Sequence, residues 1–242
     1  MKAYFRKYKE GDFIKIRDFL VSTYQNTGIP SNWLIDRWNF VRFFSQTMCE
    51  TFTKWPDTVG IWEDTQGNII AVVCSEGENR GEAFFQMNTY KLPEELLVSM
   101  FEFAETNLMQ NDNGVLGMNL RIPEDASNIE SMALNRGYKL SGWNETTSGI
   151  NISSLFEVNL PKGFKIKSGK QLTDKKQGIA HTKAFEYHET ERAKIAPLCY
   201  TMLKQAPDYQ SDLDIAVVNE QGEIVSLKLY LFVLYGMILL II

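Results

Sequence analysis

The residues best placed to do chemistry lie between Glu82 and Glu95, where a strand pattern runs directly into a helix pattern. GEAFFQMN is typical of a strand, and Pro93 followed by apolar residues at spacings of three and four is typical of a helix start. A helix N-terminus presents unpaired N–H groups and the positive end of the helix dipole. We therefore expect this junction to be a natural place for a phosphate-bearing ligand.

The loop at this junction is chemically poor for that task. Residues 88–95 contain no glycine, so backbone N–H groups cannot approach a phosphate as closely as in a glycine loop. Pro93 lacks an N–H donor, and Glu94 and Glu95 put two carboxylates where a phosphate would sit. Lys91 is the only compensating charge. The sequence predicts an ordinary, well-formed helix start that repels a pyrophosphate.

Cysteine and histidine spacing offers neither a metal site nor a disulfide framework. Cys49, Cys74 and Cys199 are far apart and odd in number, and no C-x-x-C pair occurs. Cys74 ends an apolar strand pattern, which favours an inert core thiol over a nucleophile. His181 and His188 lie seven apart on one predicted helix without a third ligand, so we interpret them as surface residues. We predict no metal.

Composition describes an ordinary globular protein of 242 residues, 44% hydrophobic and 23% charged, long enough for one large or two small domains. The net charge of −5 gives no support for nucleic-acid binding and suits a cationic small substrate slightly better than an anionic one. Residues 1–13 are charged and lack the apolar centre of a signal peptide. We expect a reduced, cytoplasmic setting.

The elements that must position these residues predict an α+β (mixed α/β) fold. We expect a largely antiparallel central sheet flanked by helices, complete by about Pro161. The aromatic stripe of the helix at 33–52 is interpreted as core-facing, with the wall of a ligand pocket as the alternative. The predicted order is a strand at 3–9, a helix from 12, a helix at 33–52, three antiparallel strands within 58–88, a helix from 93 to 108, a buried strand at 114–122, a helix from 127 to 137, and the strands KLSGWNE and SSLFEVNL.

A second, similar pattern begins after Pro161. GFKIKSG resembles the first strand, and residues that fit two helices and a hairpin follow it. Gln66-Gly67 matches Gln221-Gly222 at an offset of 155, and Asp64 matches Asn219 at the same offset. Because these matches occur in order within matching elements, they predict an internal repeat.

The predicted second copy breaks off into an apolar tail, LKLYLFVLYGMILLII. The 14 residues from Leu229 to Ile242 are fewer than the roughly 20 that a membrane-spanning helix needs. We rank a buried strand pair that arose by a frame change first, and a membrane span last. The unpaired sheet edge predicts a homodimer through residues 212–242.

These features together resemble the GCN5-related N-acetyltransferase (GNAT) superfamily, and in particular its tandem subgroup, in which one chain carries two such domains. The resemblance rests on the element order, the hairpin with Gln66-Gly67, the strand GEAFFQMN that leads into a helix, and DASNIESMALNRGY before the last strands. It covers residues 1–161 as a whole domain and 162–226 as the front half of another.

The resemblance implies acetyl-CoA between a fourth strand at 83–88 and a fifth strand at 115–122. The pantetheine arm would pair with the backbone of the fourth strand, and the pyrophosphate would sit on the loop that follows. Asn128 falls where the family often has an Asn that contacts the cofactor. The implied cofactor-binding residues are Phe85, Gln86, Met87, Asn88, Thr89, Tyr90, Lys91, Asn119 and Asn128.

The resemblance also implies direct attack of an amine on the thioester, with a base to deprotonate the ammonium and often a Tyr to protonate the leaving thiolate. Ala133 or Asn135 falls near the position of that Tyr, and Tyr138 is the only nearby hydroxyl. Glu50 and Glu82 are candidate bases. The sequence assigns no catalytic residue.

Two functions stay open from the sequence. The first is acetyl transfer from acetyl-CoA to an amine of a small molecule or peptide, in a chain that is weak or inactive because its second domain, 162–242, is truncated. The second is a non-catalytic ligand-binding or interaction module in the domain at 1–161, which the missing glycine loop favours. A membrane-tethered module would depend wholly on the tail.

Overall fold

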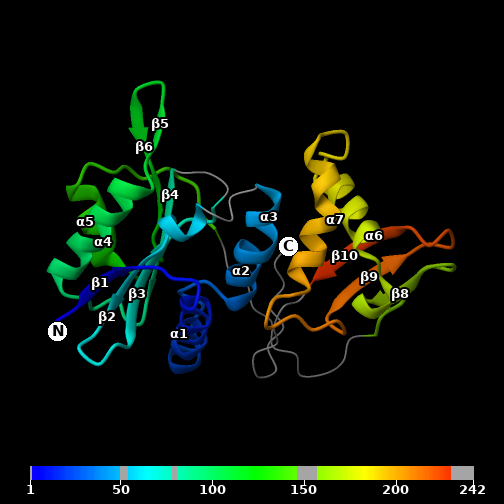
Figure 1. Ribbon diagram of the computed structural model, residues 1–242, viewed down its shortest axis with the longest axis horizontal. Coiled ribbons are helices and arrows are strands. Elements are labelled where there is room, and N and C mark those ends of the chain that lie inside the picture. The colour runs from blue at the N-terminus through cyan, green and yellow to red at the C-terminus, as the bar shows by residue number, and fades with distance from the viewer. Residues whose placement is uncertain (1, 50–53, 78–80, 146–156, 230–242) are drawn as a thin grey trace. The chain divides into compact units, whose positions relative to one another are not determined.

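The chain divides into two compact units (Figure 1). Unit 1 comprises Met1–Leu34 with Thr51–Glu145, and unit 2 comprises Ile35–Glu50 with Thr146–Ile242. The structure, a computed structural model, describes residues 2–49, 54–77, 81–145 and 157–229. The predicted strand pair of the apolar tail, residues 230–242, therefore lies outside the described residues, as does Glu50.

Unit 1 is built on a five-stranded sheet of order β1-β2-β3-β4-β7. Neighbouring strands from β1 to β4 are antiparallel, and β7 runs parallel to β4. This arrangement confirms the predicted α+β fold with a largely antiparallel sheet. The strands are β1 (Tyr4–Lys7), β2 (Gly60–Glu63), β3 (Ile69–Cys74), β4 (Glu82–Met87) and β7 (Asn119–Arg121), and a 3-10 turn, η2 (Trp55–Thr58), precedes β2.

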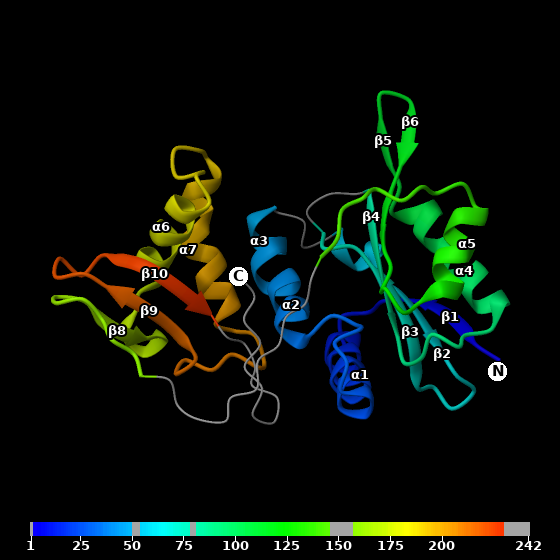
Figure 2. The ribbon, with the colours of Figure 1, turned by 180° about the vertical axis from the view of Figure 1, so that it is seen from behind.

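Helices cover both faces of this sheet. Figure 2 shows α4 (Glu94–Asn107) and α5 (Ser127–Asn135) together on one face, and α1 (Asp12–Thr27) on the other. Apolar side chains of β4, α4 and α5 form one buried cluster, in which the rings of Phe85 and Phe101 meet edge to face at 5.0 Å. The helix predicted after Pro93 is thus confirmed, and its apolar stripe faces the sheet.

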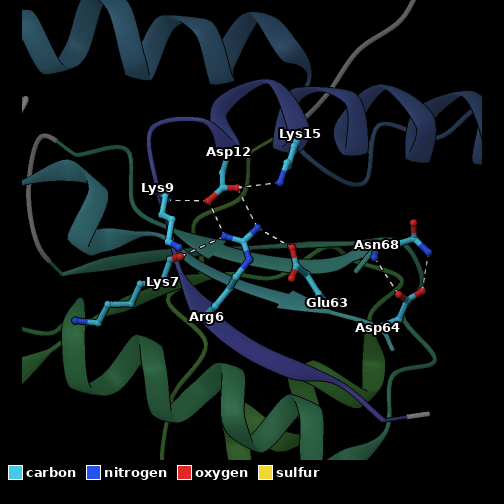
Figure 3. A network of polar contacts seen from close by, with 8 residues as sticks. All are labelled: Arg6, Lys7, Lys9, Asp12, Lys15, Glu63, Asp64 and Asn68. Atoms are coloured by element: carbon cyan, nitrogen blue, oxygen red, sulfur yellow. Dashed lines mark hydrogen bonds and ion pairs between the residues drawn. The ribbon is translucent and has the colours of Figure 1, made fainter. Parts of the chain in front are cut away.

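Arg6 on β1 connects α1 and β2 through its side chain (Figure 3). Its guanidinium on β1 contacts Asp12 at 2.6 Å, at the start of α1, and Glu63 at 2.6 Å, at the end of β2. The backbone N–H of Lys9 donates to the same Asp12 carboxylate at 2.8 Å. Burial opposes the ionised form of Asp12, but the Arg6 and Lys9 hydrogen bonds outweigh it and hold the pKa of Asp12 below its ordinary value.

The predicted buried strand at 114–122 is wrong as a single element. Residues Val115–Gly117 form β6, which folds back on β5 (Gln110–Asp112) in a separate two-stranded sheet, and only β7 joins the main sheet. Asn113 and Gly114 have φ of 54° and 88°, so the chain makes a tight turn there. Val115 is consequently 70% exposed rather than buried.

The predicted strand KLSGWNE is also wrong. Residues 139–145 form no strand, because Gly142 has φ of 76°, a left-handed conformation that breaks an extended segment. Trp143 is 55% exposed. Half of the second predicted strand, SSLFEVNL, lies outside the described ranges, and its described half, 157–160, is not a strand.

Unit 2 contains a three-stranded antiparallel sheet of order β10-β9-β8 and a pair of packed helices. Thr173 caps the first of these helices, since its hydroxyl accepts from the N–H of Lys176 at 3.3 Å, as the predicted helix start requires. The elements are β8 (Lys165–Ser168), the 3-10 turn η3 (Gly169–Gln171), α6 (Asp174–Ala184), α7 (Arg192–Leu203), β9 (Asp214–Val218) and β10 (Ile224–Leu229).

The helix predicted at 33–52 belongs to unit 2. It forms α2 (Ile35–Phe40), the π-helix η1 (Val41–Ser45) and α3 (Gln46–Met48). Its aromatic stripe does face a core, as interpreted from the sequence. That core is a cluster of Phe44, Met48, Ala196, Cys199, Tyr200 and Leu203, shared with α7.

The two hairpin turns at the predicted offset are built alike. In unit 1, Gly67 N–H donates to the carbonyl of Asp64 at 3.1 Å, and in unit 2 Gly222 N–H donates to that of Asn219 at 3.0 Å. The side chains of Asp64 and Asn219 each accept from the N–H four residues on, at 2.9 and 2.8 Å. Both glycines have positive φ, 82° and 72°. The matching positions 155 apart therefore adopt the same turn.

The two histidines do not share a helix. His181 lies on α6, whereas His188 follows its end and is exposed. His181 packs against the rings of Phe44, Phe185 and Tyr200 and is half-buried, and this burial lowers its pKa to about 4. The interpretation of His181 as a surface residue is therefore wrong.

Candidate functional site

The opening predicted from the sequence lies where β4 and β7 part. Their parallel pairing covers only Glu82↔Asn119, Ala83↔Leu120 and Phe84↔Arg121. Beyond that point β4 continues to Met87, while β7 has ended. The last residues of β4 thus present their backbone groups on the β7 side without a neighbouring strand in the described part of the chain, and α4 begins seven residues later, at Glu94.

This free edge is occupied by the side chain of Asn32. Its Nδ2 donates to the carbonyl of Met87 at 2.8 Å, and its Oδ1 accepts from the Met87 N–H at 2.9 Å. A side-chain amide carries the same donor and acceptor pair as a backbone unit. Asn32 therefore pairs with Met87 as one residue of an adjacent strand would.

The residue that follows holds the same loop against the face of β4. Trp33 N–H donates to the side-chain Oε1 of Gln86 at 2.7 Å, and the Trp33 ring lies 4.8 Å from that of Phe84. Trp33 and Gln86 are both buried. These contacts fix the position of Asn32, because they anchor the next residue of the chain to two positions on β4.

A further contact joins the loop after β4 to α5. Nδ2 of Asn128, in the first turn of α5, donates to the carbonyl of Tyr90 at 2.7 Å. Burial raises the pKa of the Tyr90 phenol, against the hydrogen bond from Ser31 that lowers it. Ser31 and Asn32 come from one loop, so that loop contacts both the end of β4 and the segment after it.

The start of α4 has the chemistry expected from the sequence. Pro93 accepts from the N–H groups of Leu96 and Leu97 at 3.0 and 3.1 Å, so the first turn is closed by its own backbone. Glu94 and Glu95 are exposed in that turn, where the helix dipole stabilises their charge. Lys91 is exposed on the preceding loop.

The remaining predicted cofactor residues are placed as follows. The Phe85 side chain points into the core and leaves only its backbone for a ligand. Asn88 N–H donates to Ile70 at 3.1 Å and so extends the pairing with β3, and Thr89 Oγ1 accepts from the N–H of Lys91 at 3.2 Å. Asn119 lies at the paired end of β7, away from the point where the strands part. The structure thus brings Gln86, Met87, Tyr90 and Asn128 together around one loop, and leaves Asn119 apart.

The candidate proton-transfer residues near the end of α5 make structural contacts or are exposed, and Glu50 lies outside the described residues. The Tyr138 hydroxyl donates to Glu105 on α4 at 3.4 Å, and burial raises the pKa of Tyr138 to about 12. Arg136 forms an ion pair with the same Glu105. Ala133 is buried in the core and Asn135 is exposed. Tyr138 therefore serves the packing of the α5 end on α4.

Sequence reasoning missed Ser31 and Asn32, and it placed Trp33 in the aromatic stripe of the helix at 33–52, which begins only at Ile35. Asn32 lies 55 positions from its partner Met87 and belongs to no motif, so no spacing could have found it. The TGIPS stretch before it predicted only a loop. Among the described residues, no three His, Cys, Asp or Glu side chains are grouped to hold a metal ion. Within the same ranges, no helix has the length and apolar character needed to cross a bilayer.

Comparisons with known proteins place this geometry in a known fold. No family model and no curated protein matches the chain. A solved GCN5-related N-acetyltransferase from Sphaerobacter thermophilus aligns over 92% of this chain and 70% of its own, with 11% identity and a TM-score of 0.50. A tandem GNAT protein from the clavulanic acid biosynthesis pathway, solved without AcCoA, aligns over 92% of this chain and 72% of its own, with 10% identity and a TM-score of 0.42.

The molecule is thus a mixed α/β protein in which the parallel strands β4 and β7 part, and the chain then continues from β4 to the start of α4. It has the GNAT fold, which confirms at the level of the fold the superfamily resemblance of the sequence. At 11% identity the likeness shows the fold alone.

Proposed function

We propose that this chain is an acetyltransferase-family protein whose unit 1 is non-catalytic. Unit 1 keeps the GNAT fold as a ligand-binding or interaction module and takes no acetyl-CoA between β4 and β7. The observation that carries this proposal is the pair of hydrogen bonds, 2.8 and 2.9 Å, between the Asn32 amide and the backbone of Met87.

The pantetheine arm of acetyl-CoA is a chain of amides, and in this fold it would need the edge groups that Asn32 already satisfies. Displacing Asn32 exchanges two internal hydrogen bonds for two with the ligand, so the ligand gains little from them. Glu94 and Glu95 then add repulsion at the end where a pyrophosphate would lie. Lys91 alone cannot offset two carboxylates.

Acetyl transfer from acetyl-CoA to an amine of a small molecule or peptide is the second candidate. It is favoured by the parting of β4 from β7 after Phe84 and by the loop that then leads to the start of α4 at Glu94. For this function Asn32 must leave Met87 when the cofactor arrives, and the phosphates must rely on Lys91 and the backbone of residues 88–92. The net charge of −5 suits an ammonium-bearing acceptor and not a nucleic acid.

Isothermal titration of the full chain with acetyl-CoA, and with CoA as a control, tests the proposal. We expect no saturable heat up to millimolar ligand. Micromolar binding that Lys91→Glu abolishes would refute it and establish the second candidate. Lys139→Glu is the matched control, because it makes the same charge change at another exposed lysine of unit 1, outside the opening.

A further inference from the structure

Two cysteines and one arginine of unit 2 lie around one buried cluster, apart from the residues of the opening in unit 1. Nη2 of Arg192 donates to Sγ of Cys49 at 3.4 Å. Cys49 is half-buried directly after α3, and it packs against the cluster that contains the fully buried Cys199. Arg192 and Cys199 both belong to α7, seven residues apart, and so lie on one side of the helix two turns from each other.

The three groups have complementary chemistry. A cation within hydrogen-bonding distance of sulfur stabilises the thiolate, which is the nucleophilic form of cysteine. The pKa of Cys199 is raised to about 12, mainly by burial and secondly by the neighbouring Cys49. Cys199 therefore keeps its proton at neutral pH. The partly exposed Cys49 is therefore the member of the pair that can carry the charge and meet a reagent from solvent.

We propose that Cys49 is a site of reversible oxidation by hydroperoxides, with Cys199 as the thiol that captures the oxidised form. In the first step the Cys49 thiolate attacks the peroxide, an S–O bond forms, the O–O bond breaks, and the alcohol or water leaves with the proton. In the second step the sulfenate on Cys49 takes a proton from solvent and becomes a sulfenic acid. Cys199 then attacks its sulfur, the S–S bond forms as the S–O bond breaks, and the Cys199 proton passes to the departing hydroxyl, which leaves as water. The peroxide is the two-electron oxidant.

The product would tie the end of α3 to α7 within unit 2. These segments already pack through Phe44, Met48 and Tyr200. The disulfide would therefore add a covalent link to a contact that the reduced chain holds by packing and by the Arg192–Cys49 hydrogen bond, and a dithiol reductant would release it. Cys74 on β3 is fully buried and serves as an internal control that should stay reduced.

The first test is alkylation of the native, reduced chain by iodoacetamide at pH 7, followed cysteine by cysteine by peptide mass spectrometry. We expect Cys49 to react at least about 100-fold faster than Cys74 and Cys199, and Arg192→Gln to slow it about tenfold. Lys194→Gln is the matched control, since it removes another exposed cation from the same helix. Equal Cys49 rates in Arg192→Gln and the parent chain would overturn the role of Arg192.

The second test treats the full chain with hydrogen peroxide and maps its peptides without reduction. We expect a Cys49–Cys199 link that dithiothreitol reverses, and in Cys199→Ala a dimedone-reactive sulfenate at Cys49. A sulfenate at Cys49 in the parent chain with no link to Cys199 would overturn the capture step. Cys49 that stays reduced while free cysteine is oxidised would overturn the proposal. Both of these measurements on the parent chain stand even where a variant fails to fold.

Discussion

Replacing Asn32 by Asp removes one hydrogen bond from the edge of β4 and leaves the shape unchanged. The ionised carboxylate can still accept from the Met87 N–H, but it cannot donate to the Met87 carbonyl, which then faces a negative charge. An unsatisfied buried acceptor costs about 1–3 kcal/mol. Because Asn32 is half-buried and water can reach it, we expect the lower part of that range, about 1.5 kcal/mol, at pH 7.

The loss of stability in Asn32→Asp should increase as pH rises. In the Asn32→Asp variant, the protonated carboxyl group both donates and accepts, as the amide of Asn32 does. The neutral form is therefore favoured in the folded state, and the pKa of the introduced carboxyl is raised there. The penalty is absent below the unfolded-state pKa of about 3.9 and grows as pH rises through the folded-state pKa. A loss of about 1.5 kcal/mol corresponds to a pKa raised by about one unit, so the penalty should be complete by about pH 6.

Asn32→Ala is the companion variant, and its loss relative to the parent chain should not change between pH 4 and pH 7. The assays are urea unfolding, analysed as a difference from the parent chain at each pH, and hydrogen exchange at the Met87 amide. Exchange should accelerate in Asn32→Ala and stay slow in Asn32→Asp, since only the latter keeps an acceptor. A Met87 amide that is equally protected in all three chains would refute the assigned role of Asn32.

Two further predictions concern the frame of unit 1. Arg6→Met should cost about 2 kcal/mol in urea unfolding, because it leaves the nearly buried Asp12 without its main partner. The folded-state pKa of Asp12 is lowered, so the loss of unfolding free energy should reach its full value above about pH 3.9. The loss should shrink as pH falls through the folded-state pKa. A loss that stays the same in acid would contradict the ion-pair explanation. Gly60→Ala should destabilise by about 1–3 kcal/mol, because a Cβ there would lie 2.9 Å from the Phe103 ring, whereas Gly117→Ala meets nothing within 4 Å and should be close to neutral in thermal unfolding. Equal midpoints for the two alanine variants would rule out the steric account.

Local patterns predicted the elements of unit 1 that are built from local contacts. The hairpin at Gly67 and the helix after Pro93 follow from turn residues and apolar spacing, and both form. The helix predicted at 33–52 forms over residues 35–48, but its membership of unit 2 was not predicted, because spacing reveals that a face is buried without revealing what covers it. The strand at 114–122 failed because an apolar run cannot distinguish one buried strand from two short strands, of which β6 is exposed in a separate hairpin and β7 joins the main sheet.

In the candidate site, too, the features set by neighbouring residues were predicted and the contacts between distant residues were not. The helix start at Pro93 and the carboxylates of Glu94 and Glu95 are where the sequence placed them, so the departure from an anion site was visible in advance. The pair between Asn32 and Met87 was not, since it joins two positions through the fold and needs only one ordinary asparagine. A single side chain that pairs with a strand edge leaves no motif.

The opening between β4 and β7 departs from a cofactor site in three independent ways. Its edge is paired by Asn32, the loop after β4 is joined to α5 by the hydrogen bond from Asn128 to Tyr90, and the helix start beyond that loop carries Glu94 and Glu95. Each of these features stabilises the unliganded unit, through satisfied backbone groups or a favourable helix dipole. A binding site must keep such groups unsatisfied until its ligand arrives, and that costs stability. These three features at one opening therefore support the proposal that unit 1 keeps its fold without a cofactor between β4 and β7.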